Sequence, residues 1–324
     1  WILSNLSRNR GGLYGRLTCE IKLSPFTLKE CEDYFKNENI EMSRYDIVQS
    51  YMVFGGIPYY LSYFKKGMSF EGNADNILFG KNPRLKDEFN RLFNAIFSNP
   101  EDCKKIIRLL AKKHVGFTRE EIAKETGLPF GGGLTDTLNA LVESDFIQRY
   151  RPYNVSGKVS FYKLIDNFSL FWLKYVEPNT EDINFMTDNM TSNIMRVWRG
   201  VAFEEVCWQH IGQIKRALGI SGVSSSISAW SVKGNDNKEG VQIDLLIIRN
   251  DNVVNLCEMK FAGDIYSIDK EEDAKIRNRI QTLINTLSPK QSVHLTMITT
   301  YGVSHTMYGG RVQQQVILDD LFQS

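Results

Sequence analysis

The spacing of hydrophobic and polar positions changes along the chain, from helical at the start to mixed helix and strand at the end. Apolar residues at helical spacing predict helices at 27–37 and 43–54, followed by a break at GGIP and further helices to about residue 98. Before them, LTCEIKL alternates like a strand and ends at a Ser-Pro dipeptide. The first part of the chain is therefore predicted to be mainly helical.

The middle of the chain has the order of elements typical of a winged helix. EDCKKIIRLLAKK has helical spacing, Thr118 and Glu121 form a capping box that opens TREEIAKETG, and LTDTLNALVESDF gives a third helix after three glycines. FIQRYRPYN and KVSFYKLID then alternate as two strands around a Ser-Gly turn. Three helices and a hairpin predict a winged helix over residues 99–165.

The last part of the chain mixes helices and strands. Residues 166–198 are aromatic and helical, with a break at Pro178, and are interpreted as a connector. Residues 199–324 read as helix, strand hairpin, helix, strand and closing strand, which predicts an α/β domain. The predicted fold class is therefore multidomain α+β.

Composition narrows the classes of protein that fit. The 324 residues are 42% hydrophobic, which suits a folded protein of about two or three domains. Five widely spaced cysteines without a C-x-x-C pair favour neither a zinc site nor a disulfide framework, so we expect a reducing, cytoplasmic setting. A net charge of +1 gives no overall attraction to nucleic acid, so any DNA binding must come from local patches.

The sequence predicts neither a signal peptide nor a membrane span. The most apolar stretch, YMVFGGIPYYLSYF, is interrupted by Gly and Pro and is shorter than the roughly 20 residues that a membrane helix needs. No membrane association is expected. The chain begins at Trp1 without a signal-peptide pattern, and we expect it to be part of a longer protein.

Three charged residues interrupt an apolar hairpin in the last domain. VQIDLLIIRNDNVVNLCEMKF predicts two strands, with Asp244 on the first and Glu258 and Lys260 on the second. If the turn is centred on Asp251, residues whose numbers sum to 502 face each other, so Asp244 opposes Glu258 and Gln242 opposes Lys260. Because side chains two apart share a face, all four are expected on one side of the sheet.

Opposed carboxylates repel one another unless a cation lies between them. Mg²⁺, or alternatively Mn²⁺, is the cation expected between Asp244 and Glu258, because Mg²⁺ prefers oxygen ligands and is usually held by one or two carboxylates. A further acid comes from the helix RGVAFEEVCWQHIGQIKRAL, where Glu204 borders the apolar face and Glu205 points toward solvent. The competing interpretation is a solvated hairpin edge on which Lys260 pairs with Glu258.

Glu204, Asp244, Glu258 and Lys260 together resemble the PD-(D/E)XK nuclease site, with a helix Glu, a strand Asp and an E-x-K on the paired strand. The resemblance implies that Glu204, Asp244 and Glu258 hold one or two Mg²⁺ ions, which polarise a phosphate and lower the pKa of a water. It implies that Lys260 orients that water or stabilises developing charge. Gln281 on the next helix could reach the site, although a surface position is the more common outcome.

The whole chain resembles the C-terminal part of archaeal-type AAA/STAND ATPases, which join an ATPase, a winged helix and a nuclease-like domain. The resemblance rests on GGLYGRLTCEIKLSPFTLKECEDYF, YMVFGGIPYYLSYF, FEE, QIDLL and CEMKF. It implies a remnant of the ATPase core with a helical lid over residues 1–98, and it implies a restriction-endonuclease-like domain over 199–324. Because the chain has no G-x-x-x-x-G-K-[ST], ATP binding would need an ATPase core upstream.

The resemblance also suggests contacts to nucleotide and DNA. Arg16 in LYGR is the candidate nucleotide-sensing arginine. The third winged-helix helix carries acids and no Lys or Arg, so the hairpin is the expected DNA contact. Its candidate DNA-binding residues are Arg149, Arg151, Lys158 and Lys163.

Two functions fit these observations. The first is the regulatory and effector part of a cytoplasmic ATP-dependent protein that ends in a Mg²⁺-dependent DNA phosphodiesterase. The alternative is a catalytically silent region that binds DNA or a partner while ATP hydrolysis occurs upstream. Either function is compatible with a homo-oligomer. For the winged helix, packing against the other domains is an equal alternative to DNA binding.

Overall fold

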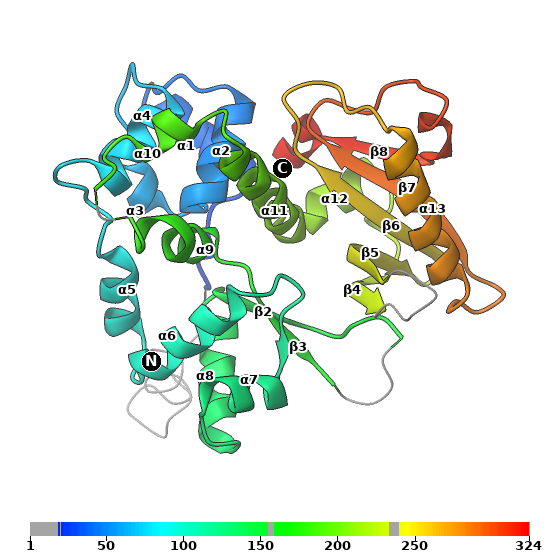
Figure 1. The fold of residues 1–324 in the computed structure, drawn as a ribbon, viewed down its shortest axis with the longest axis horizontal. Helices are drawn as coiled ribbons and strands as arrows, with labels where there is room; N and C mark the ends of the chain where they lie inside the picture. Colours follow the sequence, from blue (N-terminus) through cyan, green and yellow to red (C-terminus); the bar gives the residue numbers. More distant parts are fainter. Residues whose placement is uncertain (1–18, 20, 155–158, 180, 233–239, 324) are drawn as a thin grey trace.

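The structure is a computed structural model, which describes residues 19, 21–154, 159–179, 181–232 and 240–323. A helical region, a small unit of three helices with a hairpin, and a sheet domain lie around the long helix α11 (Asn193–Gln209) (Figure 1). This arrangement confirms a mixed α+β chain with several structural units. Within the described residues, no helix is both long enough and apolar enough to cross a membrane.

The first two predicted helices are confirmed within one residue at each end. Helix α1 (Leu28–Asn37) begins with a capping box between Thr27 and Glu30, and α2 (Arg44–Phe54) follows the N-cap Ser43. The GGIP break then brings the chain back against Phe26, two residues before α1. A Cβ at Gly56 would lie 2.0 Å from the carbonyl oxygen of Phe26, so only glycine permits this close approach.

The strand predicted at LTCEIKL is wrong where the structure describes it. Cys19 and residues 21–23 adopt no regular structure and pair with no described strand. Ile21 and Leu23 are 79% and 90% exposed. An alternating pattern specifies a strand only where a neighbouring strand takes up its backbone hydrogen bonds, and none of the described strands does so here.

Aromatic packing joins the remaining N-terminal helices to residues 166–192. The Phe89 and Trp172 rings stack with centroids 4.6 Å apart, and the Asp75 carboxylate accepts a hydrogen bond from the Met186 backbone N–H at 2.7 Å. The expected connector therefore packs as part of the helical core, and the break near Pro178 is present. The elements are α3 (Pro58–Leu61), α4 (Phe70–Ala74), η2 (Asp75–Phe79), α5 (Glu88–Ile96), α9 (Asn167–Phe171), η3 (Trp172–Val176) and α10 (Phe185–Asn189).

The middle unit has the three helices and the hairpin that the sequence predicts. The capping box of Thr118 with Glu121 is present, and the third helix begins within the triple glycine rather than after it. One strand more than expected, β1, pairs with β3 ahead of the second helix. The elements are α6 (Pro100–Leu110), β1 (Phe117–Thr118), α7 (Arg119–Thr126), α8 (Gly132–Glu143), β2 (Ile147–Tyr150) and β3 (Phe161–Leu164).

The C-terminal domain is a five-stranded sheet in the order β4-β5-β6-β7-β8, antiparallel from β4 to β6 and parallel from β6 to β8. Strand β4 was not predicted, because SSISAWSV carries only a weak apolar alternation. Figure 1 shows α11 and α12 on the inner face of the sheet, whereas α13 covers the outer face. The elements are α12 (Ile211–Ala217), β4 (Ser225–Val232), β5 (Val241–Arg249), β6 (Val253–Lys260), α13 (Lys270–Ile284), β7 (Ser292–Thr299), η4 (Gly309–Arg311), β8 (Gln314–Ile317) and η5 (Leu318–Phe322).

A buried histidine joins the sheet domain to the first helix. His210 is 1% exposed, and its Nε2 accepts a hydrogen bond from the Leu28 backbone N–H at 3.0 Å. Because Nε2 is the acceptor, the ring proton is on Nδ1, which donates to the Val206 carbonyl at 2.8 Å. Burial lowers the pKa of His210 to about 4. The neutral imidazole is therefore the form that holds these segments together.

Acidification should weaken this contact between pH 6.5 and pH 4. In that range the unfolded chain takes up a proton that folded His210 resists, so the protein should lose on the order of 3 kcal/mol of stability. The His210→Gln variant cannot titrate there. We expect it to be less stable than wild type at pH 7.5 and to lose less melting temperature on acidification. Equal losses in melting temperature for the two proteins would show that His210 does not set this response.

Candidate active site

The predicted register of the charged hairpin is confirmed. All four β5–β6 pairs, from Leu245 opposite Cys257 to Ile248 opposite Val254, have residue numbers that sum to 502 as predicted. The ladder ends one position before Asp244 and Glu258. Beyond that point β5 continues to pair with β4, and β6 with β7. The candidate residues therefore lie where the two strands stop pairing.

A bulge in β5 changes the direction of Asp244. Ser228 of β4 pairs with Leu246 of β5, and the next pair is Trp230 with Ile243. Between these two pairs β4 advances two residues and β5 three, so β5 contains one extra residue at 244–245. Ile243 and Leu246 pack in the apolar cluster with α13, whereas Leu245 packs in the cluster with α11. Asp244 therefore lies on the α11 side, where its carboxylate accepts a 2.5 Å hydrogen bond from Gln242.

The expectation that four charged and polar side chains share one face is therefore wrong. Leu256 of β6 packs with α13, so Glu258 and Lys260, two and four residues further on, also project toward α13. Strict alternation along β5 would place Asp244 with them. The extra residue in β5 instead turns Asp244 and Gln242 to the opposite face.

Helix α11 brings a second acid to Asp244. The Trp208 indole N–H donates to the backbone carbonyl of Asp244 at 2.9 Å, and Glu204 lies one helical turn before Trp208 on the same side of the helix. Burial, and next the negative charge of Asp244, raises the pKa of Glu204 to about 8. The Glu204 carboxyl has no hydrogen-bond or ion-pair partner among the described residues, and the nearby charge of Asp244 acts on it.

The other two candidate residues are paired with α13 instead. Glu258 is 8% exposed, and its carboxylate accepts a 2.9 Å hydrogen bond from the Arg279 guanidinium. Lys260 forms a 2.7 Å ion pair with Glu272. The pairing of Lys260 with Glu258 that the competing interpretation requires is therefore not formed. Neither Arg279 nor Glu272 was identified from the sequence. The two residues lie seven positions apart on α13, the helix that follows the hairpin.

All four predicted residues still interact at the end of the sheet. The charge of Asp244 raises the pKa of both Glu204 and Glu258, and the charge of Lys260 lowers both. However, the part of the chain that the structure describes contains no group of three or more His, Cys, Asp and Glu side chains placed to hold a metal. The arrangement fits a cation held by Glu204 and Asp244, since two carboxylates suffice for Mg²⁺. It does not fit a three-carboxylate site while Glu258 is bound to Arg279.

Glu205 is buried rather than solvated as expected. It pairs with Lys163, which is therefore not available as a DNA contact. Glu205 is 0% exposed and forms a 2.9 Å ion pair with Lys163, which is itself 4% exposed. The Lys163 ammonium also lies over the Trp208 ring, 4.7 Å from its centroid. The expected role of Lys163 in binding DNA is therefore wrong for this structure. Its charge instead fixes β3 against α11.

The other candidate residues outside the sheet end have different environments. Arg149 and Arg151 are exposed on and after β2, where DNA could reach them. Arg16 and Lys158 lie outside the described residues. Gln281 is exposed and bonds only to Asn285 on its own helix at 3.3 Å, so it takes no part in the site.

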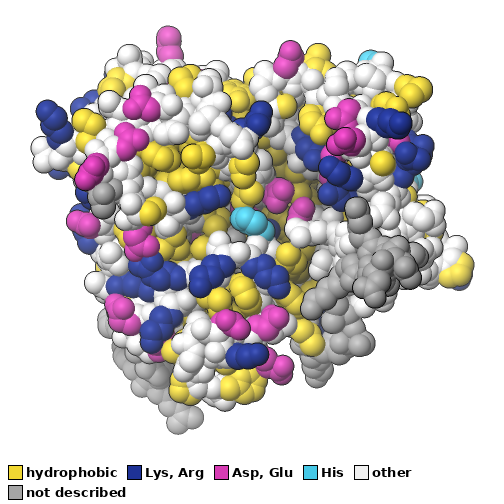
Figure 2. Space-filling view, viewed as in Figure 1, with side chains coloured by type: hydrophobic (Ala, Val, Ile, Leu, Met, Phe, Trp, Pro, Cys, Tyr) yellow, Lys and Arg dark blue, Asp and Glu magenta, His cyan; other side chains and the backbone are white. Residues whose placement is uncertain are grey.

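His114 is a neighbour that the sequence did not single out. Burial, and next the charges of Lys163 and Lys174, lowers the pKa of its ring, whereas Asp244 raises it. Figure 2 shows acidic side chains beside a histidine in the hollow between the middle unit and the sheet domain, with Lys and Arg side chains nearby. The middle unit therefore forms one wall beside Asp244.

Comparison with known proteins gives one distant relative. No family model matches the chain. An uncharacterized protein of Methanocaldococcus jannaschii is 28% identical over 245 residues, which are 74% of this chain and 52% of the relative. The chain spans about half the length of the relative that it matches.

Proposed function

We propose that residues 193–322 form a PD-(D/E)XK-like domain that hydrolyses DNA phosphodiester bonds with Mg²⁺ or Mn²⁺. The observation that carries the proposal is the pair Glu204 and Asp244, two interacting acids at the end of the sheet, of which Glu204 has a pKa raised to about 8. Such an arrangement destabilises a protein, and perturbed acids of this kind concentrate at functional sites. The order helix, hairpin, helix, strand also agrees with the resemblance.

Each residue has a defined task under this proposal. Asp244, turned by the bulge, and Glu204 hold the cation, which supplies Lewis-acid activation of phosphate and water when it is bound. Lys260 supplies a positive charge at the sheet end that stabilises negative charge on the phosphate. The exposed Arg149 and Arg151 of the middle unit contact the DNA backbone.

The proposal includes a wider setting for this domain. The chain resembles the C-terminal part of archaeal-type AAA/STAND ATPases, and it corresponds to about half of its archaeal relative. We therefore propose that ATP acts through a P-loop domain outside this sequence. DNA is then the substrate of the sheet domain, and the helical region couples the two.

A second function is favoured by the α13 contacts. Arg279 neutralises Glu258 and Glu272 neutralises Lys260, so the E-x-K residues have internal partners that need neither metal nor DNA. A catalytically silent region that binds DNA or a partner has this property. The two functions differ in whether the Glu204–Asp244 pair binds a cation.

Plasmid nicking separates these two functions. We expect wild type to convert supercoiled plasmid to the nicked form with Mg²⁺ or Mn²⁺ and not with EDTA. Lys260→Ala should nick at least roughly a hundredfold more slowly, the usual cost of losing a charge that stabilises the transition state. Lys270→Ala, which removes an exposed lysine from the same domain, is the matched control and should nick like wild type. Wild type that never nicks DNA would support the silent region.

A further inference from the structure

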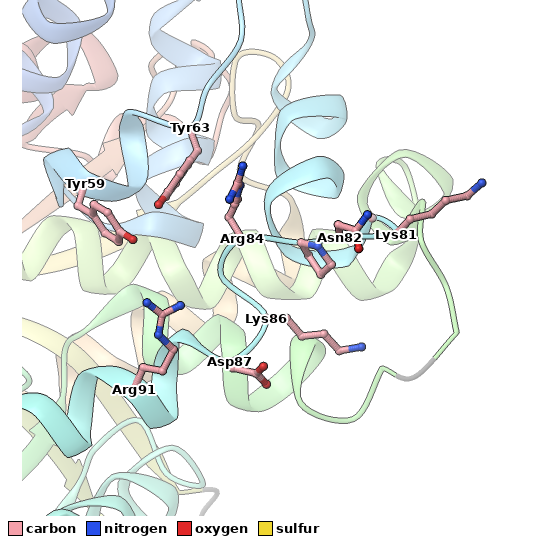
Figure 3. A pocket seen from close by; sticks show the side chains of 10 residues that line it. Tyr59, Tyr63, Lys81, Asn82, Arg84, Lys86, Asp87 and Arg91 are labelled. Carbon is pink, nitrogen blue, oxygen red and sulfur yellow. The ribbon is translucent and has the colours of Figure 1, made fainter.

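A basic pocket on the helical region lies apart from the sheet domain. It has a volume of about 540 Å³ and is lined by two tyrosines of the α3 segment and by the loop and first turn that lead into α5. Figure 3 shows the Arg84 and Arg91 side chains nearest to the tyrosines, whereas the Lys81 and Lys86 side chains extend away from them. The four lining cations are Lys81, Arg84, Lys86 and Arg91.

The side chains of these four cations face solvent. All four are exposed, and none of them forms an ion pair or a side-chain hydrogen bond within the described residues. Asp87 is the single acid in the lining, and Glu88 is buried next to it. The four positive charges on this short segment outnumber the two neighbouring acids, Asp87 and Glu88, and their mutual repulsion favours the binding of an anion.

The loop that carries the cations is held in one conformation. The Leu85 side chain is 0% exposed, and its backbone N–H donates to the Ile77 carbonyl at 3.0 Å. The Trp172 indole N–H donates to the Lys86 carbonyl at 2.7 Å. Gly80 is also tied to Asp75 by a 2.7 Å backbone hydrogen bond. The cations are thus presented by a fixed backbone, which reduces the entropy lost on binding.

The tyrosines add a surface for flat rings. Tyr59 is 49% exposed, and its ring meets the Tyr63 ring edge to face with centroids 5.2 Å apart. The Tyr63 ring supports Tyr59 and leaves its outer side open to the pocket (Figure 3). Exposed aromatic rings beside a line of cations are the combination with which proteins bind single-stranded nucleic acid.

We propose that this pocket binds single-stranded nucleic acid, with the phosphates on Arg84, Lys86 and Arg91 and a base stacked on Tyr59. A lone small molecule fits less well, because such sites are mostly apolar and enclose their ligand. This pocket is lined mainly by charged and polar residues. The inference is independent of the sheet-domain site and supplies a second contact for nucleic acid on the helical region.

The test is fluorescence anisotropy with a labelled dT20 oligonucleotide in EDTA. The double variant Arg84→Gln/Lys86→Gln should bind roughly tenfold more weakly and reduce the slope of log affinity against log salt by about 1.4, since each phosphate contact on a single strand contributes about 0.7. Tyr59→Ala should weaken binding roughly tenfold, the size expected for loss of one stacked base. A 20-base-pair duplex should lose no affinity from Tyr59→Ala.

Two controls isolate the pocket. Lys65→Gln/Lys66→Gln removes the same charge from exposed positions of the helical region that do not line it, and this variant should bind dT20 like wild type. Lys270→Ala, at an exposed lysine outside both proposed sites, should also keep dT20 affinity, and EDTA removes the cation that the proposed nuclease function needs. Melting curves should show all variants folded, because each change is at an exposed residue. Equal losses of affinity in the pocket and control variants, or no loss from the pocket variants, would overturn the inference.

Discussion

Replacing Lys163 by methionine should lower the free energy of unfolding by roughly 3–5 kcal/mol, because it leaves Glu205 buried without its counter-charge. Burial already raises the pKa of Glu205, and Lys163 is the group that lowers it. Without Lys163, folding would have to protonate this carboxyl. The loss of stability should therefore be largest at alkaline pH and smaller near pH 5.

The double variant Lys163→Met/Glu205→Leu distinguishes a buried ion pair from simple packing. Removing both charges should restore most of the lost stability, since buried pairs replaced by apolar side chains are often neutral or stabilising. Urea unfolding of wild type, both single variants and the double variant gives the coupling energy between the two side chains. Losses that simply add would show that the ion pair does not link the middle unit to α11.

Asp244→Asn should abolish the stabilisation of the protein by magnesium. In the absence of metal, the substitution removes the repulsion of Glu204 and should stabilise the protein by on the order of 1 kcal/mol. With saturating Mg²⁺, wild type should gain about 2 kcal/mol from ligand binding, whereas Asp244→Asn should gain nothing. Melting curves should therefore show Asp244→Asn as the more stable protein without Mg²⁺ and wild type as the more stable protein with saturating Mg²⁺.

Arg279→Gln provides the complementary variant. It frees the Glu258 carboxylate, which is nearly buried and bonded to Arg279 in the structure. If Glu258 then joins the cation site, the stabilisation by Mg²⁺ should exceed that of wild type. A smaller effect of Mg²⁺ in this variant would show that Arg279 supports the site rather than competing with the cation.

The sequence was sufficient to predict features that depend on local chemistry. Apolar residues at helical spacing and the GGIP break predicted α1 and α2, and the turn residues predicted the register of β5 with β6. Periodicity also located α13 and β7. These elements depend on residues that are close together in the sequence, so the sequence alone is enough to predict them.

Features that depend on distant partners could not be predicted. The bulge at Asp244 arises from pairing with β4, a strand that the sequence pattern barely marks. The burial of Glu205 depends on Lys163 from a different structural unit, and the neutralisation of Glu258 depends on Arg279. The charges of Glu204, Asp244, Glu258 and Lys260 do act on one another at the sheet end, but the division of these residues between two faces needs the three-dimensional fold.

The most direct test of the account is calorimetric titration of wild type and Asp244→Asn with Mn²⁺ at pH 7 and pH 8.5. Because a bound cation requires ionised Glu204, whose pKa is about 8, wild type should bind Mn²⁺ more tightly at pH 8.5 and release a proton on binding at pH 7. Asp244→Asn should bind at least roughly tenfold more weakly at both pH values. Wild type without saturable Mn²⁺ binding at either pH, or with binding that Asp244→Asn leaves unchanged, would contradict a cation site at Glu204 and Asp244.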